Sequence, residues 1–273
     1  MTDKRPIATA FGPHRLAGWS WDGDAARDLV LFHAGVCDSR SWDRVAPELT
    51  DLGSVWAYDR PGYGVTPTID PRPNHVEVAA AFLSANLRRP AWLVASSMGG
   101  AVALDVAVAR PDLVAGLVLL APAVTGGPEL DVTPEERELD QRASAALSAG
   151  DPDEANRFEI WYWLDGPAQA EGRVGGATRV LALEMNRELV GTGAESGFDE
   201  TVDAWAHAPE LRMPVTVAVG EYEESAIRTA GRALAGRIPG GRYVELAGTA
   251  HLPYLDSPDQ VIEVVRAAVT ASP

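Results

Sequence analysis

The sequence is poor in cysteine and lysine and contains no long hydrophobic run. Cys37 is the only cysteine among 273 residues, so neither a disulfide nor a cysteine-based metal cluster can form within the chain. Lys4 is the only lysine among 23 basic residues, a preference for arginine that is typical of GC-rich bacterial genes. No segment approaches the roughly 20 apolar residues of a membrane span, and no apolar signal region follows Met1–Pro6. We therefore expect a cytoplasmic protein with no membrane partner.

The charge balance narrows the class of partner. A formal net charge of -16 repels the phosphates of nucleic acid and of anionic lipid. We therefore expect a small-molecule substrate and no nucleic acid, while the oligomeric state is not indicated. With 46% hydrophobic residues, the chain can bury one large core, which favours a single domain with an insertion.

Short apolar runs alternate with longer helical patterns, as in a parallel sheet covered on both faces. The expected strands are Leu29–His33, Val55–Tyr58, Trp92–Ser96, Val114–Leu120, Val215–Gly220 and Tyr243–Leu246, preceded by a hairpin of Ile7–Phe11 and Arg15–Trp21. The expected helices are Trp42–Leu49, Val76–Leu87, Gly99–Ala109, Ser225–Ile238 and Gln260–Ala271. This order predicts an α/β fold with a mostly parallel eight-stranded sheet flanked by helices.

One long stretch, 126–213, breaks the alternation. It contains no apolar strand, and the residues from Thr133 to Glu136 (TPEE) are typical of a helix start. We interpret 126–213 as a helical cap inserted into a core formed by 1–125 and 214–273.

Residues 94–100 (VASSMGG) join an apolar strand directly to a helical pattern, which is the setting of a nucleophile elbow. The residues two before and two after the nucleophile must be small, because the strand and helix backbones pass closely there. These residues are Ala95 and Gly99 if Ser97 is the nucleophile, and the bulky Val94 and Met98 if Ser96 is. The spacing therefore favours Ser97.

A small-residue loop, 33–35 (HAG), ends the first strong strand, where such folds place the second donor of an oxyanion hole. Acyl transfer requires backbone amides aimed at the developing negative oxygen. We expect the amides of Met98 and Gly35 to form this hole, and we expect His33 to brace the loop.

Two further groups of residues have candidate structural or functional roles. Asp59 and Arg60 follow a strand at the same edge of the sheet, and we expect them to form a buried ion pair that fixes a loop. The aromatic cluster of Trp161, Tyr162 and Trp163 either lines an apolar substrate pocket between cap and core or holds the cap helices together.

Five ordered motifs together resemble the α/β-hydrolase superfamily, particularly its small esterase and lactonase-like members. They are HAG at 33–35 followed by Trp42, YDRPGYG at 58–64, SSMGG at 96–100, VGEYE at 219–223, and GTAH at 248–251 followed by Leu255 and Pro258. The likeness covers most of the chain, and five motifs in order are far more specific than one.

The resemblance implies a triad in the order Ser97, acid, His251, because the family's histidine lies in the loop after the last strand. The family's usual aspartate is replaced by Glu223, with Glu221 and Glu224 as alternatives. A second departure is Ala34, where the family usually has glycine at the first oxyanion loop. Asp256 follows His251 closely, and we expect it to help start the last helix.

The residues and the resemblance together predict a serine hydrolase that cleaves an ester or lactone of a small to medium apolar substrate through an acyl-enzyme. No metal and no organic cofactor is required. Other activities on the same fold stay open: carbon–carbon bond hydrolysis, a lyase or cofactor-free oxygenase reaction, or ligand binding without catalysis.

Overall fold

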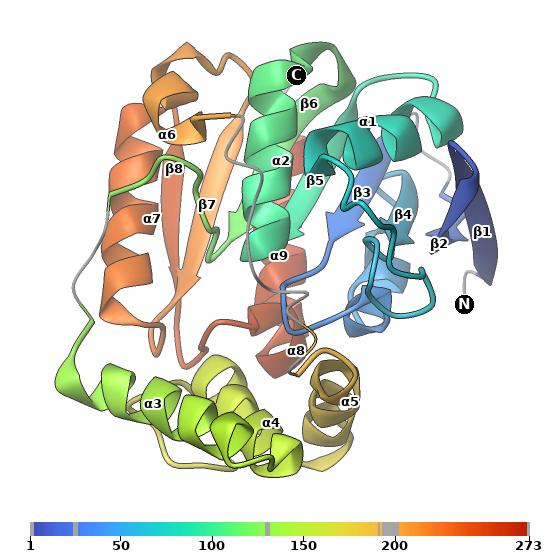
Figure 1. Ribbon diagram of the computed structural model, residues 1–273. Helices are drawn as coiled ribbons and strands as arrows, with labels where there is room; N and C mark the ends of the chain where they lie inside the picture. Colours follow the sequence, from blue (N-terminus) through green and yellow to red (C-terminus); the bar gives the residue numbers. More distant parts are fainter. Residues whose placement is uncertain (1–2, 24–26, 129–131, 191, 193–201, 272–273) are drawn as a thin grey trace.

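The computed structural model describes residues 3–23, 27–128, 132–190, 192 and 202–271. Its centre is an eight-stranded sheet in the order β1-β2-β4-β3-β5-β6-β7-β8 (Figure 1). β1 pairs antiparallel with β2, and β2 pairs antiparallel with β4, whereas all other neighbouring strands in this sheet are parallel. The predicted α/β fold class is confirmed.

The strands are β1 (Lys4–Phe11), β2 (His14–Trp21), β3 (Asp28–Phe32), β4 (Ser54–Tyr58), β5 (Ala91–Ser96), β6 (Val114–Leu120), β7 (Val215–Gly220) and β8 (Arg242–Leu246). The helices are α1 (His75–Asn86), α2 (Met98–Ala109), α3 (Pro134–Ser148), α4 (Pro152–Ile160), α5 (Gly176–Arg187), α6 (Ala204–His207), α7 (Ser225–Arg237), α8 (Pro253–Asp256) and α9 (Pro258–Thr270). Shorter turns are η1 (Ser39–Trp42), η2 (Ala46–Leu49), η3 (Pro111–Leu113), the π-helical η4 (Trp161–Asp165) and η5 (Ala208–Glu210). No described helix combines the length and the hydropathy needed to cross a membrane.

Alternate residues of the central strands contribute to opposite faces of the sheet. In β3, Val30 and Phe32 join one hydrophobic cluster, which includes residues of α1, α2, α6 and α7. Leu29 and Leu31 join the other cluster, which includes residues of α8 and α9. The two-residue period of a strand thus explains why its sequence is apolar throughout: both faces are covered.

One predicted helix has a different form. In place of one α-helix over residues 42–49, the structure has two separate 3-10 turns: η1, which ends at Trp42, and η2, which covers Ala46–Leu49. Pro47 accounts for the difference, because it has no amide hydrogen to donate and cannot sit inside a regular helix.

The helices α3, α4 and α5 lie together beyond one end of the sheet (Figure 1). α3, α4 and η4 share a small cluster formed by Leu139, Ala143, Phe158 and Tyr162, whereas Ala182 and Met185 of α5 join the cluster that contains residues of α8 and α9. α6, which also falls within the expected cap 126–213, packs on the sheet side instead, and its Ala204 joins the cluster that contains α2. The cap is defined here as α3 to α5 together with η4.

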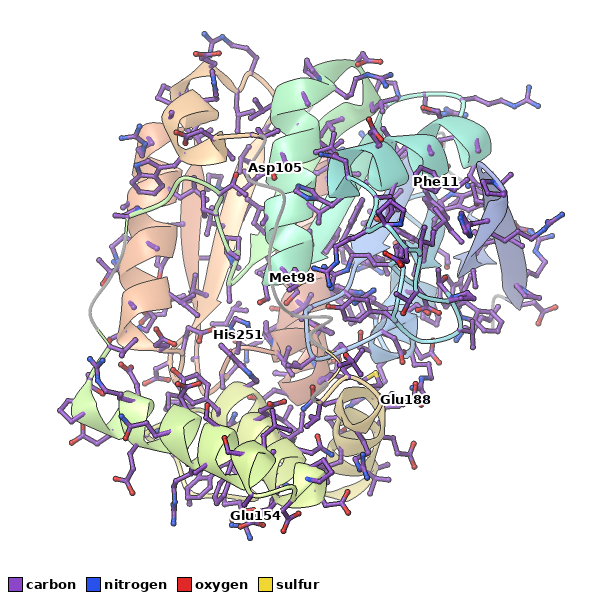
Figure 2. The ribbon with its side chains drawn as sticks, viewed as in Figure 1. Phe11, Met98, Asp105, Glu154, Glu188 and His251 are labelled. Atoms are coloured by element: carbon purple, nitrogen blue, oxygen red, sulfur yellow. The ribbon has the colours of Figure 1, made fainter. Side chains whose placement is uncertain are left out.

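Because β3, β5, β7 and β8 belong to the parallel part of the sheet, the loops that follow them emerge at the same edge. These loops carry Gly35, Ser97, Glu223 and His251. Figure 2 shows His251 between this edge and the cap. The topology therefore gathers the predicted site residues, which are scattered along the chain.

Candidate active site

Ser97 occupies a sharp turn between β5 and α2. Its backbone is left-handed, with φ 52° and ψ -118°, a conformation that non-glycine residues rarely adopt. The turn is held from several sides: the Ser97 amide donates to Leu120 O at 2.9 Å, and Ser97 O accepts from the amides of Gly100 at 2.8 Å and Ala123 at 3.0 Å. Ser96 is fully buried, whereas Ser97 is partly exposed. The local geometry is that of the predicted elbow.

Gly99 explains why the elbow needs small residues. A Cβ on this glycine would lie 2.6 Å from the carbonyl oxygens of both Phe32 and His33. These are backbone atoms of the neighbouring strand, so they cannot swing aside as a flexible side chain would. The close approach of α2 to β3 therefore requires glycine here.

Replacing Gly99 by alanine is expected to lower the free energy of unfolding by about 3 kcal/mol, as in strongly overpacked sites. Urea denaturation of both proteins measures the change. Gly236→Ala is the matched control, because Gly236 is exposed in α7 and its Cβ would meet nothing within 4 Å. That change should stabilise the protein by up to about 1 kcal/mol. Equal effects at the two positions would contradict the close-approach explanation.

His251 and Glu223 form a buried pair. Nδ1 of His251 lies 2.6 Å from Oε2 of Glu223, and the two residues are only 3% and 5% exposed. An ionised carboxylate can only accept a hydrogen bond, so Nδ1 carries the proton and Nε2 is the basic nitrogen. The other Glu223 oxygen accepts the amide of Glu224 at 2.8 Å.

The two alternative acids have other partners. Glu221 accepts a hydrogen bond from the Gly248 amide at 2.8 Å. Glu224 accepts one from the Tyr162 hydroxyl at 2.5 Å. Of the three glutamates, Glu223 is the one that contacts the imidazole.

The two amides expected in the oxyanion hole lie on neighbouring backbone segments. A Cβ on Gly35 would be 3.3 Å from Cε of Met98, so the 33–35 loop packs against the start of α2. Met98 is the first residue of α2, and the amides of a first helical turn have no partner within the helix. The Met98 amide is therefore not used by α2 itself.

His33 braces the oxyanion loop. Its Nδ1 lies 2.8 Å from Ala34 O, and its Nε2 accepts the Arg60 amide at 3.2 Å. Arg60 also donates to Ala34 O at 3.0 Å. Complete burial, reinforced by the Arg60 charge, lowers the pKa of His33 well below 6.5 and keeps the ring neutral.

Asp59 and Arg60 fix loops separately rather than as the expected ion pair. Asp59 accepts the amides of Ser39 at 2.8 Å and Val65 at 3.1 Å, while Arg60 turns toward His33 and Ala34. The expectation of a mutual ion pair is wrong because backbone amides of two different loops converge on the carboxylate and satisfy it.

The three cap aromatics have different surroundings. Nε1 of Trp161 donates to Gln169 O at 2.8 Å, within the cap. Trp163 lies against His251, with ring centroids 4.4 Å apart. Tyr162 lies against Trp163, at 4.6 Å between centroids, and both line a cavity of about 260 Å³ between the cap and the Glu224 loop. The turn η4 is thus the part of the cap that contacts the His251–Glu223 pair.

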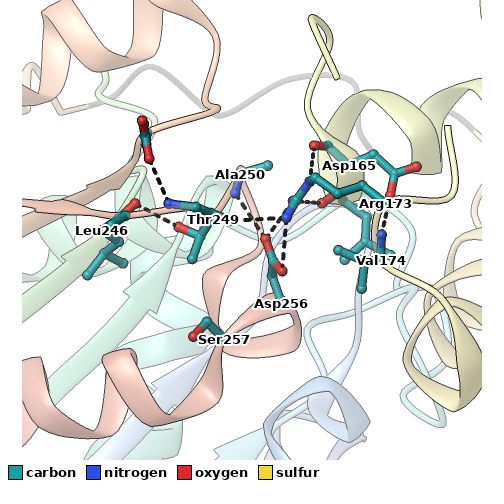
Figure 3. A network of polar contacts seen from close by, with 12 residues as sticks. Asp165, Arg173, Val174, Leu246, Thr249, Ala250, Asp256 and Ser257 are labelled. Atoms are coloured by element: carbon teal, nitrogen blue, oxygen red, sulfur yellow. Dashed lines mark hydrogen bonds and ion pairs between the residues drawn. The ribbon is translucent and has the colours of Figure 1, made fainter. Parts of the chain in front are cut away.

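A second connection between cap and core was not predicted from the sequence. Arg173 donates to Asp256 at 2.6 Å and to Gly248 O at 2.9 Å, and Asp256 accepts the Ala250 amide at 3.2 Å (Figure 3). Asp256 therefore secures the loop of His251 and contacts the cap, whereas Ser257 occupies the N-cap position of α9 without a side-chain hydrogen bond to the helix. An isolated arginine in a loop carries no local signal of such a role.

The comparisons with known proteins agree with this architecture. The model of the alpha/beta hydrolase family matches residues 29–264. A pimeloyl-[acyl-carrier protein] methyl ester esterase of Neisseria meningitidis serogroup B is 27% identical over 255 residues, which cover 89% of this chain and 93% of that protein. Lipase LipV of Mycobacterium tuberculosis is 40% identical over 101 residues, 35% of this chain and 37% of its own.

Solved structures resemble the whole chain. A thermophilic esterase from Thermogutta terrifontis has a TM-score of 0.77 at 22% identity, with 99% of each chain covered. The enol-lactonase from Burkholderia xenovorans LB400 also has a TM-score of 0.77, at 20% identity, covering 97% of this chain and all of that one. At these identities the likeness concerns the fold. Because the family model spans well over half of the sequence, the chain belongs to the alpha/beta hydrolase family.

Proposed function

We propose that this protein is a serine hydrolase that cleaves a carboxylic ester or lactone of a small to medium apolar substrate. The observation that carries the proposal is the buried His251–Glu223 pair, 2.6 Å apart, at the sheet edge where Ser97 occupies its left-handed turn. The curated relative of N. meningitidis is named as a methyl ester esterase, which supports the same reaction class.

In the proposed reaction, Ser97 Oγ attacks the substrate carbonyl while His251 Nε2 accepts its proton. Glu223 stabilises the imidazolium that forms. The amides of Met98 and Gly35 donate to the oxygen that becomes negative in the tetrahedral intermediate. His251 then gives its proton to the leaving alcohol, and water, activated by the same histidine, releases the acid and restores Ser97.

The cavity beside Trp163 is the proposed site of the acyl chain. Phe158, Tyr162 and Trp163 form an aromatic part of its wall that suits an apolar group, beside a part lined by charged residues. Its volume is about 260 Å³. A methylene occupies roughly the volume of a water molecule, about 30 Å³, so chains of up to about eight carbons fit.

A series of p-nitrophenyl esters of increasing chain length tests the proposal. We expect kcat/KM to rise with chain length up to about eight carbons and to fall beyond it, because longer chains exceed the cavity. An ester that ends in a carboxylate should be a poorer substrate than its neutral counterpart, because Glu136, Asp140, Glu159 and Glu224 line the cavity, and Arg137 is the one basic residue among the described residues that line it.

The same experiment includes the outcomes that contradict the proposal. A fluorophosphonate should label Ser97, and hydrolysis in ¹⁸O-water should place one ¹⁸O in the acid product. Absence of both labelling and ester turnover would favour a ligand-binding protein. Labelling without ester or lactone cleavage would point to carbon–carbon bond cleavage or to another reaction on the same fold.

A further inference from the structure

Three consecutive residues after β7 connect the candidate histidine to the cap. Glu223 contacts His251 at 2.6 Å. Glu224 accepts the Tyr162 hydroxyl of η4 at 2.5 Å. The next residue, Ser225, donates its amide to Glu136 of α3 at 2.8 Å. Glu223 therefore orients the imidazole, and the two residues that follow it, Glu224 and Ser225, hold the cap.

The cap returns a contact to the same imidazole. Trp163 follows Tyr162 directly in η4, and its ring lies 4.4 Å from the His251 ring, centroid to centroid. Two neighbouring residues of η4 therefore contact the same small region: Tyr162 donates to Glu224, and Trp163 lies against His251. Glu223, the residue before Glu224, joins the two contacts because it binds His251. A shift of η4 would change both the Tyr162–Glu224 contact and the Trp163–His251 contact.

The C-terminal end of η4 also packs closely against residues 222–224 of the loop after β7. Gly166 ends the turn with φ 100°, and a Cβ there would lie 2.7 Å from Tyr222 O. A π-helical turn is rare and often marks a functional position. Here it brings both Tyr162 and Gly166 against residues 222–224.

The two residues of the Tyr162–Glu224 hydrogen bond are largely buried, although both also line the cavity beside Trp163. The two residues are 8% and 9% exposed, and desolvation raises the pKa of Glu224 above its ordinary value. Removing the hydroxyl would leave a buried carboxyl oxygen without this donor, which is costly because water cannot replace it fully. The contact therefore favours the position that η4 has in the structure.

We propose that Tyr162 and Glu224 are positioning residues whose hydrogen bond holds η4 on the acid loop and so keeps both Trp163 and Glu223 in contact with His251. The inference rests on the proposed function, since it assigns these residues to the same site. It differs from the expectation that Tyr162 binds substrate: the hydroxyl acts on the loop, and the catalytic rate depends on it.

Four variants test the positioning role. Tyr162→Phe and Glu224→Ala both remove the hydrogen bond, whereas Glu224→Gln keeps an oxygen that can accept it. We expect the first two to lower kcat about tenfold with KM changed less than about threefold, and the glutamine variant to retain kcat within about threefold. The double variant Tyr162→Phe/Glu224→Ala should be no slower than either single variant, because the two act through one contact.

Tyr243→Phe is the matched control, since Tyr243 lies on β8 with its ring 4.4 Å from the Arg232 guanidinium, away from η4. Its kcat and KM should equal those of the wild type. Thermal unfolding of every variant identifies any loss of activity that reflects a smaller folded fraction.

A second readout does not depend on ester turnover. The chain has five histidines, so the His251 ring signals can be assigned by NMR with single substitutions. The Trp163 ring should shift these signals in the wild type, and Tyr162→Phe and Glu224→Ala should reduce that shift while Glu224→Gln preserves it. This measurement remains decisive if the protein hydrolyses no ester at all.

The outcomes separate the two proposals. A tenfold loss of kcat in Tyr162→Phe, rescue in Glu224→Gln and a changed His251 shift support the positioning role. A loss confined to KM makes Tyr162 a substrate contact and overturns it, as does an unchanged His251 signal in both Tyr162→Phe and Glu224→Ala. An inactive wild type that also resists the fluorophosphonate removes the proposed function, and the NMR result still decides the Tyr162–Glu224 contact.

Discussion

Ser97→Ala is expected to lower kcat for p-nitrophenyl ester hydrolysis by about 10⁴- to 10⁶-fold, the range found when a catalytic nucleophile is removed. The methyl group cannot form the acyl-enzyme, so only the oxyanion hole and substrate binding contribute to the remaining rate. Because Ser97 lies in a strained turn and is partly exposed, the loss of its hydroxyl should leave folding nearly unchanged. Steady-state kinetics and circular dichroism measure the two effects.

Ser96→Ala is the matched control for this prediction. Ser96 is adjacent in sequence but fully buried at the end of β5. Its replacement should change kcat by less than about tenfold and should leave fluorophosphonate labelling intact. Loss of activity in Ser96→Ala together with retained activity in Ser97→Ala would contradict the elbow assignment.

Glu223→Gln is expected to lower kcat by about 10³- to 10⁴-fold. The carboxylate accepts the Nδ1 proton and stabilises the imidazolium. An amide is neutral, and its NH₂ group favours the tautomer in which Nε2 is no longer basic. The 2.6 Å contact and the burial of both residues make this dependence strong. Steady-state kinetics of the ester series measure it.

Glu223→Asp and Glu221→Gln sharpen the test. Aspartate keeps the charge but shortens the side chain by one methylene, so we expect an intermediate loss of about 10- to 100-fold. Glu221 contacts the Gly248 amide on the exposed side of the loop, and its replacement should change kcat less than about threefold. Greater loss in Glu221→Gln than in Glu223→Gln would show that the acid has been assigned to the wrong residue.

The cap contacts the histidine and the acid loop of the candidate active site. Its π-helical turn contacts His251 through Trp163 and contacts the acid loop through Tyr162. Arg173 adds an ion pair to Asp256 at the end of α8, and Asp256 accepts the Ala250 amide beside His251. Substitutions in the cap are therefore expected to affect the rate as well as substrate preference, because the same segment lines the cavity and supports the imidazole.

Features that depend on local backbone constraints were predictable from the amino-acid sequence alone. The strands were recognisable because both faces of the sheet are covered, which makes their sequences apolar throughout. The elbow was recognisable because backbone crowding at Gly99 permits only a small residue, a restriction visible within five residues of chain. The order of the motifs then indicated the family, which the family match confirmed.

The side chains that meet in the site could be identified only from the three-dimensional packing of the chain. Glu221, Glu223 and Glu224 lie on one turn, so their sequence is equally compatible with each of them facing His251, and the direction of each side chain separates them. Arg173 reaches a partner 83 residues away, and Tyr162 reaches one 62 residues away. Such contacts depend on how the cap packs against the sheet. Because this packing involves residues far apart in the chain, short-range sequence patterns do not encode it.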